Sequence, residues 1–217
     1  MDFIFEQIRV GGDRNFGYLV GDRAAGVGAL IDPSYDPEML VERATDQGLT
    51  VEVIINTHGH PDHTNGNRRA RELTRAPLAA HPSAASSPDI ELEDGSSLGL
   101  GSLTLRFLHV PGHSEDHLLV HLAEQRVAIT GDLLFVGKIG GTGTEEAARR
   151  EYESLNRVLE ELPDDTTVWA GHDYGCRPSS TIALEKIANP FLQCEGFEDF
   201  FQLKKDWPTF KERHGLK

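Results

Sequence analysis

Apolar positions along the chain form short runs and periodic stretches that recur in two similar halves. Apolar runs bounded by glycine, proline or aspartate indicate strands, whereas apolar residues spaced three and four apart indicate helices. Each half is rich in strands and is followed by helices. The predicted strands are 3–10, 16–21, 27–31, 51–55, 77–80, 103–110, 118–122, 126–129 and 167–170, and the predicted helices are 37–47, 67–75, 145–162 and 179–188.

The longest periodic stretch, residues 145–162, has its large apolar side chains on one helical face, as in a helix that packs on a sheet. Strands and helices in this order predict a core of two sheets with helices outside them. No short-period repeat is visible, and 217 residues suffice for one substantial core. The apolar face of the helix consists of Tyr152, Leu155, Val158, Leu159 and Leu162.

A histidine-rich motif follows the apolar strand 51–55 directly. His58 and His60 project to the same side of an extended segment, because side chains alternate along it. The proline at the next position ends that segment and pre-sets a helical turn, so Asp62 and His63 are aimed differently. Imidazole and carboxylate suit zinc, manganese and ferrous iron. A plain surface loop has no need for this spacing after a buried strand, so we predict two adjacent metal sites.

This HxHxDH motif resembles that of the metallo-β-lactamase-fold hydrolases, in which three isolated metal ligands follow it. Residues in the matching positions are His113 in PGHS, Asp132 in TGD and His172 in AGHDY. The similarity extends from residue 10 to about residue 192, and within the superfamily the chain most resembles the hydroxyacylglutathione hydrolases (glyoxalase II) and the persulfide dioxygenases. The resemblance implies an α/β fold, the four-layer αβ/βα sandwich. We expect 1–192 to form the catalytic domain and 193–217 a helical tail packed on it.

The resemblance also implies a binuclear centre that uses every one of these ligands. It assigns His58, His60 and His113 to one metal ion, Asp62, His63 and His172 to the other, and Asp132 to both. The cofactors are then two divalent ions, zinc first, with iron and manganese as alternatives. Such ions make hydroxide available near neutral pH and stabilise a developing oxyanion. Asp62 and Asp132 are the candidate catalytic residues, and the implied reaction is hydrolysis of a thioester or related ester.

Other activities share this set of residues. Persulfide dioxygenases use the residues that match His58, His113 and Asp132 to hold a single ferrous ion, and two histidines with one carboxylate suit that chemistry. Their signature also includes the Asp-Tyr pair after the last histidine and the Asn-Pro pair after the following helix, both present here. A lactonase or another metallohydrolase is a further alternative. A non-enzymatic scaffold would lack a ligand, and none is missing.

Substrate recognition departs from the glyoxalase II pattern. Those proteins carry a cation nine positions after the bridging aspartate, where this chain has Gly141. Lys138 is the nearest cation and is the candidate for holding an anionic substrate. Tyr174 matches the family tyrosine that faces the substrate, and Arg177 is a further candidate. Typical glyoxalase II proteins also have a longer helical substrate domain after the region matched here.

The remaining histidines are predicted to be structural: His81, His109, His117 and His121. For His81 a contact around the metal ligands is the alternative, and His214 lies in the polar tail. Asp32 and Thr57 are candidate partners for the outer nitrogens of metal-bound imidazoles. For Asp32 the alternative is a turn carboxylate before a proline.

Bulk properties narrow the choice of partners. The chain has 21 Lys and Arg against 35 Asp and Glu, a net charge of −14, which argues against a nucleic-acid partner. No apolar run is long enough for a transmembrane helix, and the first residues do not resemble a signal peptide.

Two cysteines predict free thiols and a cytoplasmic location. The aromatic residues of the tail are expected to pack on the domain, with a pocket wall or a homo-oligomer contact as alternatives.

Overall fold

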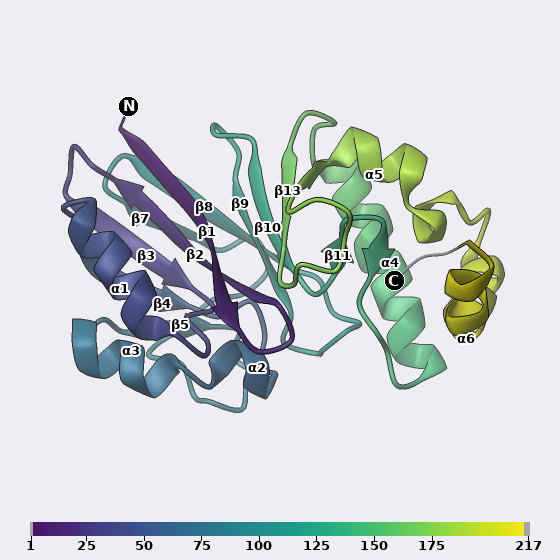
Figure 1. Cartoon of the computed structure of the whole chain (residues 1–217), viewed down its shortest axis with the longest axis horizontal. Coiled ribbons are helices and arrows are strands. Elements are labelled where there is room, and N and C mark those ends of the chain that lie inside the picture. The colour runs from purple at the N-terminus through teal and green to yellow at the C-terminus, as the bar shows by residue number, and fades with distance from the viewer. Residues whose placement is uncertain (1, 215–217) are drawn as a thin grey trace.

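The computed structural model describes residues 2–214, with the backbone alone for His214. Two six-stranded sheets stack face to face and helices cover both outer faces, which makes four layers (Figure 1). The first sheet has the order β1-β2-β3-β4-β5-β6 and the second has the order β14-β13-β10-β9-β8-β7. This architecture confirms the mixed α/β fold with two sheets and outer helices.

The first half of the chain builds one sheet and its helices. Its strands are β1 (Phe3–Gly11), β2 (Asn15–Asp22), β3 (Val27–Ile31), β4 (Thr50–Ile55), β5 (Leu78–Ala80) and β6 (Ile90–Glu91). Its helices are α1 (Pro37–Asp46), α2 (Pro61–Thr64) and α3 (Asn67–Thr74).

The second half builds the other sheet. Its strands are β7 (Ser97–Leu100), β8 (Leu103–His109), β9 (Leu118–Leu122), β10 (Val127–Gly131), β13 (Thr167–Ala170) and β14 (Ser180–Thr181). A separate hairpin consists of β11 (Leu134–Phe135) and β12 (Lys138–Ile139). The helices are α4 (Glu145–Glu161), α5 (Ile182–Ala188), the 3₁₀ helix η1 (Pro190–Gln193) and α6 (Phe197–His214).

Three apolar clusters fill the spaces between the four layers. The central cluster, which includes Tyr18 and Phe107, joins the inner faces of the two sheets. A second cluster packs α1 and α3 on the first sheet through Leu40 and Ala70. The third packs the C-terminal helices on the second sheet and contains the predicted apolar face of α4. Burying each large side chain of this kind stabilises the fold by about 1.5–3 kcal/mol.

The aromatic residues of the tail pack within the chain. Phe200 of α6 is fully buried, and its ring lies 5.2 Å from that of Tyr152 on α4. Trp207 lies 4.6 Å from Phe191 of η1, between ring centroids. The separation of a tail at residue 193 and a contact between copies stay predictions, and residues 215–217 lie outside the described part. Across residues 2–214, no helix has both the length and the apolar character needed to span a membrane.

The predicted helix 179–188 was too long at its start. Ser180 and Thr181 form β14, which pairs antiparallel with Val168 and Thr167 of β13. The Thr181 side chain then caps α5 by accepting a hydrogen bond from the Leu184 N–H. Strand pairing decides this boundary, and helical periodicity carries no information about a partner strand. The hairpin β11–β12 was also not predicted, because its second strand lies in the glycine-rich segment 137–143, which reads as a loop.

Two pairs of parallel strands end at the same edge of the sandwich. Strand β3 runs parallel to β4, and β10 runs parallel to β13. Asp32 follows β3, Asp132 follows β10 and His172 comes soon after β13. Main-chain bonds join the two sheets here, since the Phe16 N–H donates to the Gly171 carbonyl oxygen at 2.8 Å. The carboxyl ends of four strands therefore bring residues far apart in sequence to one place.

Candidate metal centre

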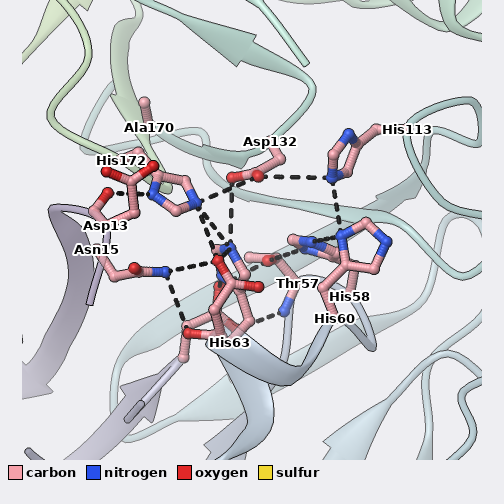
Figure 2. Close-up of polar contacts among 12 residues, drawn as sticks. Asp13, Asn15, Thr57, His58, His60, His63, His113, Asp132, Ala170 and His172 are labelled. Carbon is pink, nitrogen blue, oxygen red and sulfur yellow. Dashed lines mark hydrogen bonds and ion pairs between the residues drawn. The ribbon is translucent and has the colours of Figure 1, made fainter. Parts of the chain in front are cut away.

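The first cluster of candidate ligands consists of three imidazoles. His60 Nδ1 lies 3.1 Å from His58 Nε2 and 3.0 Å from His113 Nε2 (Figure 2). His58 and His60 come from the loop after β4, and His113 comes from the loop between β8 and β9. All three donor nitrogens lie within 4.8 Å of one another. His58 is buried, and the other two are partly open to solvent.

The second cluster consists of one carboxylate and two imidazoles. Nε2 of His63 lies 3.3 Å from Nε2 of His172, which in turn lies 3.4 Å from Asp62 Oδ2. Helix α2 begins at the motif's proline and carries Asp62 and His63 in its first turn, as the sequence predicted. Asn15 donates from Nδ2 to Asp62 Oδ2 at 3.1 Å and thereby orients the carboxylate.

Asp132 lies between the two clusters. Its Oδ2 is 3.5 Å from His113 Nε2 and 3.3 Å from His172 Nε2. Its Oδ1 is 3.4 Å from His63 Nε2, and this buried oxygen accepts no hydrogen bond within the described residues. One carboxylate therefore faces nitrogens of both clusters.

Hydrogen bonds on the outer side determine which imidazole nitrogens carry hydrogen. Nδ1 of His63 donates to Asp32 Oδ2 at 2.9 Å. Nδ1 of His113 donates to the Gly141 carbonyl oxygen at 2.8 Å, and Nδ1 of His172 donates to the Asp13 carbonyl oxygen at 2.8 Å. In the neutral ring the remaining nitrogen carries a lone pair, so Nε2 of all three presents that lone pair to the centre.

Asp32 and Thr57 contact the ligands as the sequence predicted. Asp32 accepts from the Thr57 N–H at 2.8 Å and from the Thr57 hydroxyl at 2.6 Å. The same hydroxyl oxygen lies 3.1 Å from His58 Nδ1. Asp32 thus supports His63 directly and His58 through Thr57. It has a φ of +48°, a strained value that the surrounding hydrogen bonds hold in place.

These donors fit a divalent cation. Lone pairs of neighbouring imidazoles that point at one another and at the Asp132 carboxylate repel unless a positive charge lies between them. Nitrogen and carboxylate donors in such sets suit zinc, iron or manganese. The absence of a side chain at Gly171 leaves room for the Asp132 carboxylate, because a Cβ there would clash with Asp132 Oδ1.

Electrostatics divides the histidines into two kinds. Burial lowers the pKa of His58 well below its ordinary value and also lowers that of His113. Burial alone would lower the pKa of His63 too, but the neighbouring carboxylates of Asp132 and Asp32 raise it well above its ordinary value. The pKa of Asp132 lies well below its usual range, because the effect of His172 and His63 exceeds that of burial. A proton or a metal ion can therefore stabilise the second cluster.

The remaining histidines take several roles. His81 and His109 stack on each other with ring centroids 4.1 Å apart, and neither belongs to the two clusters. His117 lies under the centre: its ring stacks on His58, and its Nε2 accepts from the Asp132 N–H at 3.0 Å. The sequence did not predict this contact, because no local pattern distinguishes His117, just before β9, from His121 within it. The side chain of His214 lies outside the described residues.

The candidate substrate residues gather only in part. The Tyr174 ring stacks on His172 at 4.6 Å with an angle of 5° between the ring planes. The Lys138 ammonium lies 4.2 Å from the centroid of the Tyr174 ring, and the Arg14 guanidinium lies 4.8 Å from it. Arg14 was not predicted from the sequence. Arg177 is exposed and donates to Ser180 Oγ at 3.0 Å, so its assignment to the substrate stays a prediction.

A four-layer sandwich with this histidine and aspartate centre at its edge defines a class of metal-dependent enzymes. The family model of the metallo-β-lactamase superfamily matches residues 10–172, and the chain belongs to that superfamily. It is 36% identical to a hydroxyacylglutathione hydrolase of Gloeobacter violaceus, with 83% of this chain and 85% of that protein covered.

Similarity extends equally to a second kind of enzyme. The chain is 31% identical to the human mitochondrial persulfide dioxygenase ETHE1, over 84% of this chain and 74% of that protein. The crystal structure of ETHE1 from Myxococcus xanthus matches with a TM-score of 0.87 and 32% identity, over 94% of this chain and 91% of that one. These comparisons support an enzyme of this family and do not separate a hydrolase from a dioxygenase.

Proposed function

We propose that this chain is a hydrolase of thioesters or related esters that works with two divalent metal ions. The observation that carries the proposal is the completeness of the second cluster. The donor atoms of Asp62, His63 and His172 lie within 4.8 Å of one another, as do those of the three imidazoles of the first cluster. A hydrolase with two ions uses this second set of donors, whereas an enzyme with a single ion at the first cluster leaves it without a metal.

Divalent ions held in these clusters would act as Lewis acids on a carbonyl oxygen and would make hydroxide available near neutral pH. The protein's own contribution is to fix the donors. Asp132 holds the two clusters together, and Asp32 keeps His63 in the tautomer that directs Nε2 inward. The Asp62 side chain is 35% exposed, which leaves this carboxylate accessible to exchange a proton with the substrate or solvent.

Recognition of an anionic substrate rests on Lys138 and Arg14. Both cations lie over the Tyr174 ring, which itself stacks on His172. Burial lowers the pKa of Lys138, and the positive charges of Lys211 and Arg14 lower it further. A negative group of the substrate would relieve this repulsion between cations. Lys138 also lines a groove of about 500 Å³ between the glycine-rich segment 140–143 and α6.

The second candidate function is a persulfide dioxygenase with one ferrous ion. It is supported by the similarity to the two ETHE1 proteins. The donor set His58, His113 and Asp132 has two imidazoles and one carboxylate, which suits oxygen chemistry at iron.

Metal analysis and two assays on the same preparation separate the two functions. Two ions per chain, hydrolysis of S-lactoylglutathione and no oxygen uptake with glutathione persulfide would support the hydrolase. One iron per chain with oxygen uptake would support the dioxygenase.

The variant His172→Ala sharpens the test because it removes a donor of the second cluster alone. A hydrolase that needs both ions should lose nearly all activity, whereas a single-iron dioxygenase should keep most of it. His109→Ala, which changes a histidine outside both clusters, is the matched control.

A further inference from the structure

The C-terminal helix α6 contacts the segment beside the candidate metal centre through Lys204. Lys204 donates from Nζ to the Gly140 carbonyl oxygen at 2.9 Å and forms an ion pair with Glu151 of α4. The Lys204 side chain is 10% exposed, and that of Glu151 is fully buried. A buried ion pair requires good geometry and additional hydrogen bonds to offset desolvation. The bond to Gly140 is one of these.

Gly140 is pressed against the ligands. A Cβ at this position would clash with the Asp132 carbonyl oxygen and would lie 2.8 Å from His113 Nδ1. The next carbonyl oxygen, that of Gly141, accepts the hydrogen bond from His113 Nδ1 at 2.8 Å. Lys204 therefore holds one carbonyl group, and the adjacent carbonyl group orients the imidazole of the first cluster.

Glu151 also packs on the segment that carries His113. Gly112 has a φ of +148°, and a Cβ there would clash with the Glu151 backbone. One turn further along α4, the Ser154 hydroxyl donates to the Pro111 carbonyl oxygen at 2.8 Å. The ion pair thus contacts both segments that fix His113. One is residues 111–112, which precede His113 in sequence, and the other is residues 140–141, which lie behind its ring.

We propose that Lys204 is a positioning residue for the first metal-ligand cluster, through which α6 holds the Gly140–Gly141 peptide behind His113. The inference rests on the proposed metal site. Without the lysine, the Gly140 carbonyl group loses a buried donor, and the segment that orients the His113 ring becomes free to shift. Partners on the outer side of metal ligands typically change metal affinity by about 10–100-fold when removed.

Zn²⁺ affinity of the metal-free protein, measured by competition with a chromophoric chelator, tests the proposal without any assay of activity. Lys204→Met should weaken Zn²⁺ binding by about 10–100-fold. Lys205→Met makes the same change of charge on the next residue of the helix, where the ammonium lies over Phe201 at 4.1 Å. It should stay within about twofold of the parent. Lys204→Arg, which keeps a cation with N–H donors, should recover most of the affinity.

The double variant Lys204→Met with Glu151→Gln separates positioning from folding, because it removes the unpaired buried carboxylate. It should unfold in urea close to the parent and still bind Zn²⁺ weakly. The proposal is overturned if Lys204→Met binds Zn²⁺ like the parent, if Lys205→Met loses as much, or if Glu151→Gln restores the affinity. A parent that binds no Zn²⁺ would instead overturn the proposed function, and this inference with it.

Discussion

The two clusters of candidate ligands lie side by side with Asp132 facing both, but the protein supports them by different means. The first cluster has three imidazoles and no carboxylate of its own, and a main-chain carbonyl group, that of Gly141, orients His113. The second contains Asp62 and is backed by the buried carboxylate of Asp32. Negative charge is therefore concentrated around the second cluster.

This difference has a consequence for how each cluster is stabilised without metal. In the first cluster burial lowers the pKa of His58 and of His113 and so favours the neutral form of these two rings. In the second cluster the carboxylates outweigh burial and raise the pKa of His63 and His172. The first cluster depends on the shape of the surrounding loops, whereas the second depends on charge.

Asp132→Ala should have the largest effect, because this carboxylate serves both clusters. We expect bound metal well below that of the parent and loss of turnover by more than about a thousandfold, as for other groups on which the chemistry depends. Metal analysis and hydrolysis of S-lactoylglutathione measure both. If this variant keeps full metal content and activity, the binuclear assignment is wrong.

His63→Ala and His172→Ala should each empty or weaken the second cluster while the first keeps its three imidazoles. His109→Ala and His121→Ala should leave the metal stoichiometry unchanged, because neither residue belongs to a cluster. Metal content per chain decides the comparison. Equal loss across all four variants would show that the inward-facing histidines have been misassigned.

The raised pKa of His63 predicts how metal affinity depends on pH. Burial lowers this pKa, but Asp132 and Asp32 raise it well above the ordinary value, so the metal-free ring holds its proton to higher pH than a free imidazole does. An incoming ion must displace that proton, and affinity therefore falls as the pH falls. Displacement of one proton weakens Zn²⁺ binding by at most about tenfold for each pH unit by which the pH falls. An affinity independent of pH over this range would contradict the charge-based account of the second cluster.

Asp32→Asn should weaken metal binding at the second cluster by about 10–100-fold, because it removes the charge behind His63. The fold should also lose about 1–3 kcal/mol, since buried donors lose their charged acceptor. Asp22→Asn is the matched control: that carboxylate is buried and accepts hydrogen bonds from Ser102, away from the centre. The control should lower stability in urea and leave Zn²⁺ affinity unchanged. Equal effects on Zn²⁺ affinity would remove the special role of Asp32.

Lys138→Ala should have the smallest effect. We expect KM for an anionic thioester to rise about tenfold with kcat unchanged, or roughly 1.4 kcal/mol of lost binding.

Gly141→Lys places a cation where glyoxalase II proteins carry theirs, and a Cβ at Gly141 meets nothing within 4 Å. It should improve use of S-lactoylglutathione over a thioester without the glutathione carboxylates. Lys138→Ala could instead change KM equally for charged and neutral thioesters, and Gly141→Lys could change KM for neither. The metal chemistry would then stand, and the acyl substrate would be a different one.

Local periodicity was sufficient to predict most of the helices and strands. The strand Val27–Ile31 appears as predicted, and α1, α3 and α4 lie within a residue of the predicted bounds. Period-two and period-3.6 patterns show which side of an element is buried, so they can be read without knowing which elements lie beside it. The errors fall where neighbours decide. Ser180–Thr181 became a strand by pairing with β13, and the hairpin Leu134–Ile139 formed in a glycine-rich stretch.

The sequence by itself determined the family and the ligand types, because His58 to His63 lie within one turn-forming segment whose spacing carries its own geometry. It also named Asp32 and Thr57 as candidates, since metal-bound imidazoles usually donate their outer N–H to such groups. Only the tertiary structure decided that His117 supports Asp132, that Arg14 joins Lys138 over Tyr174, and that Lys204 reaches Gly140. These contacts join residues 15 to 160 positions apart. Side chains that distant meet only when strand order and helix packing bring them together, and no local pattern records that meeting.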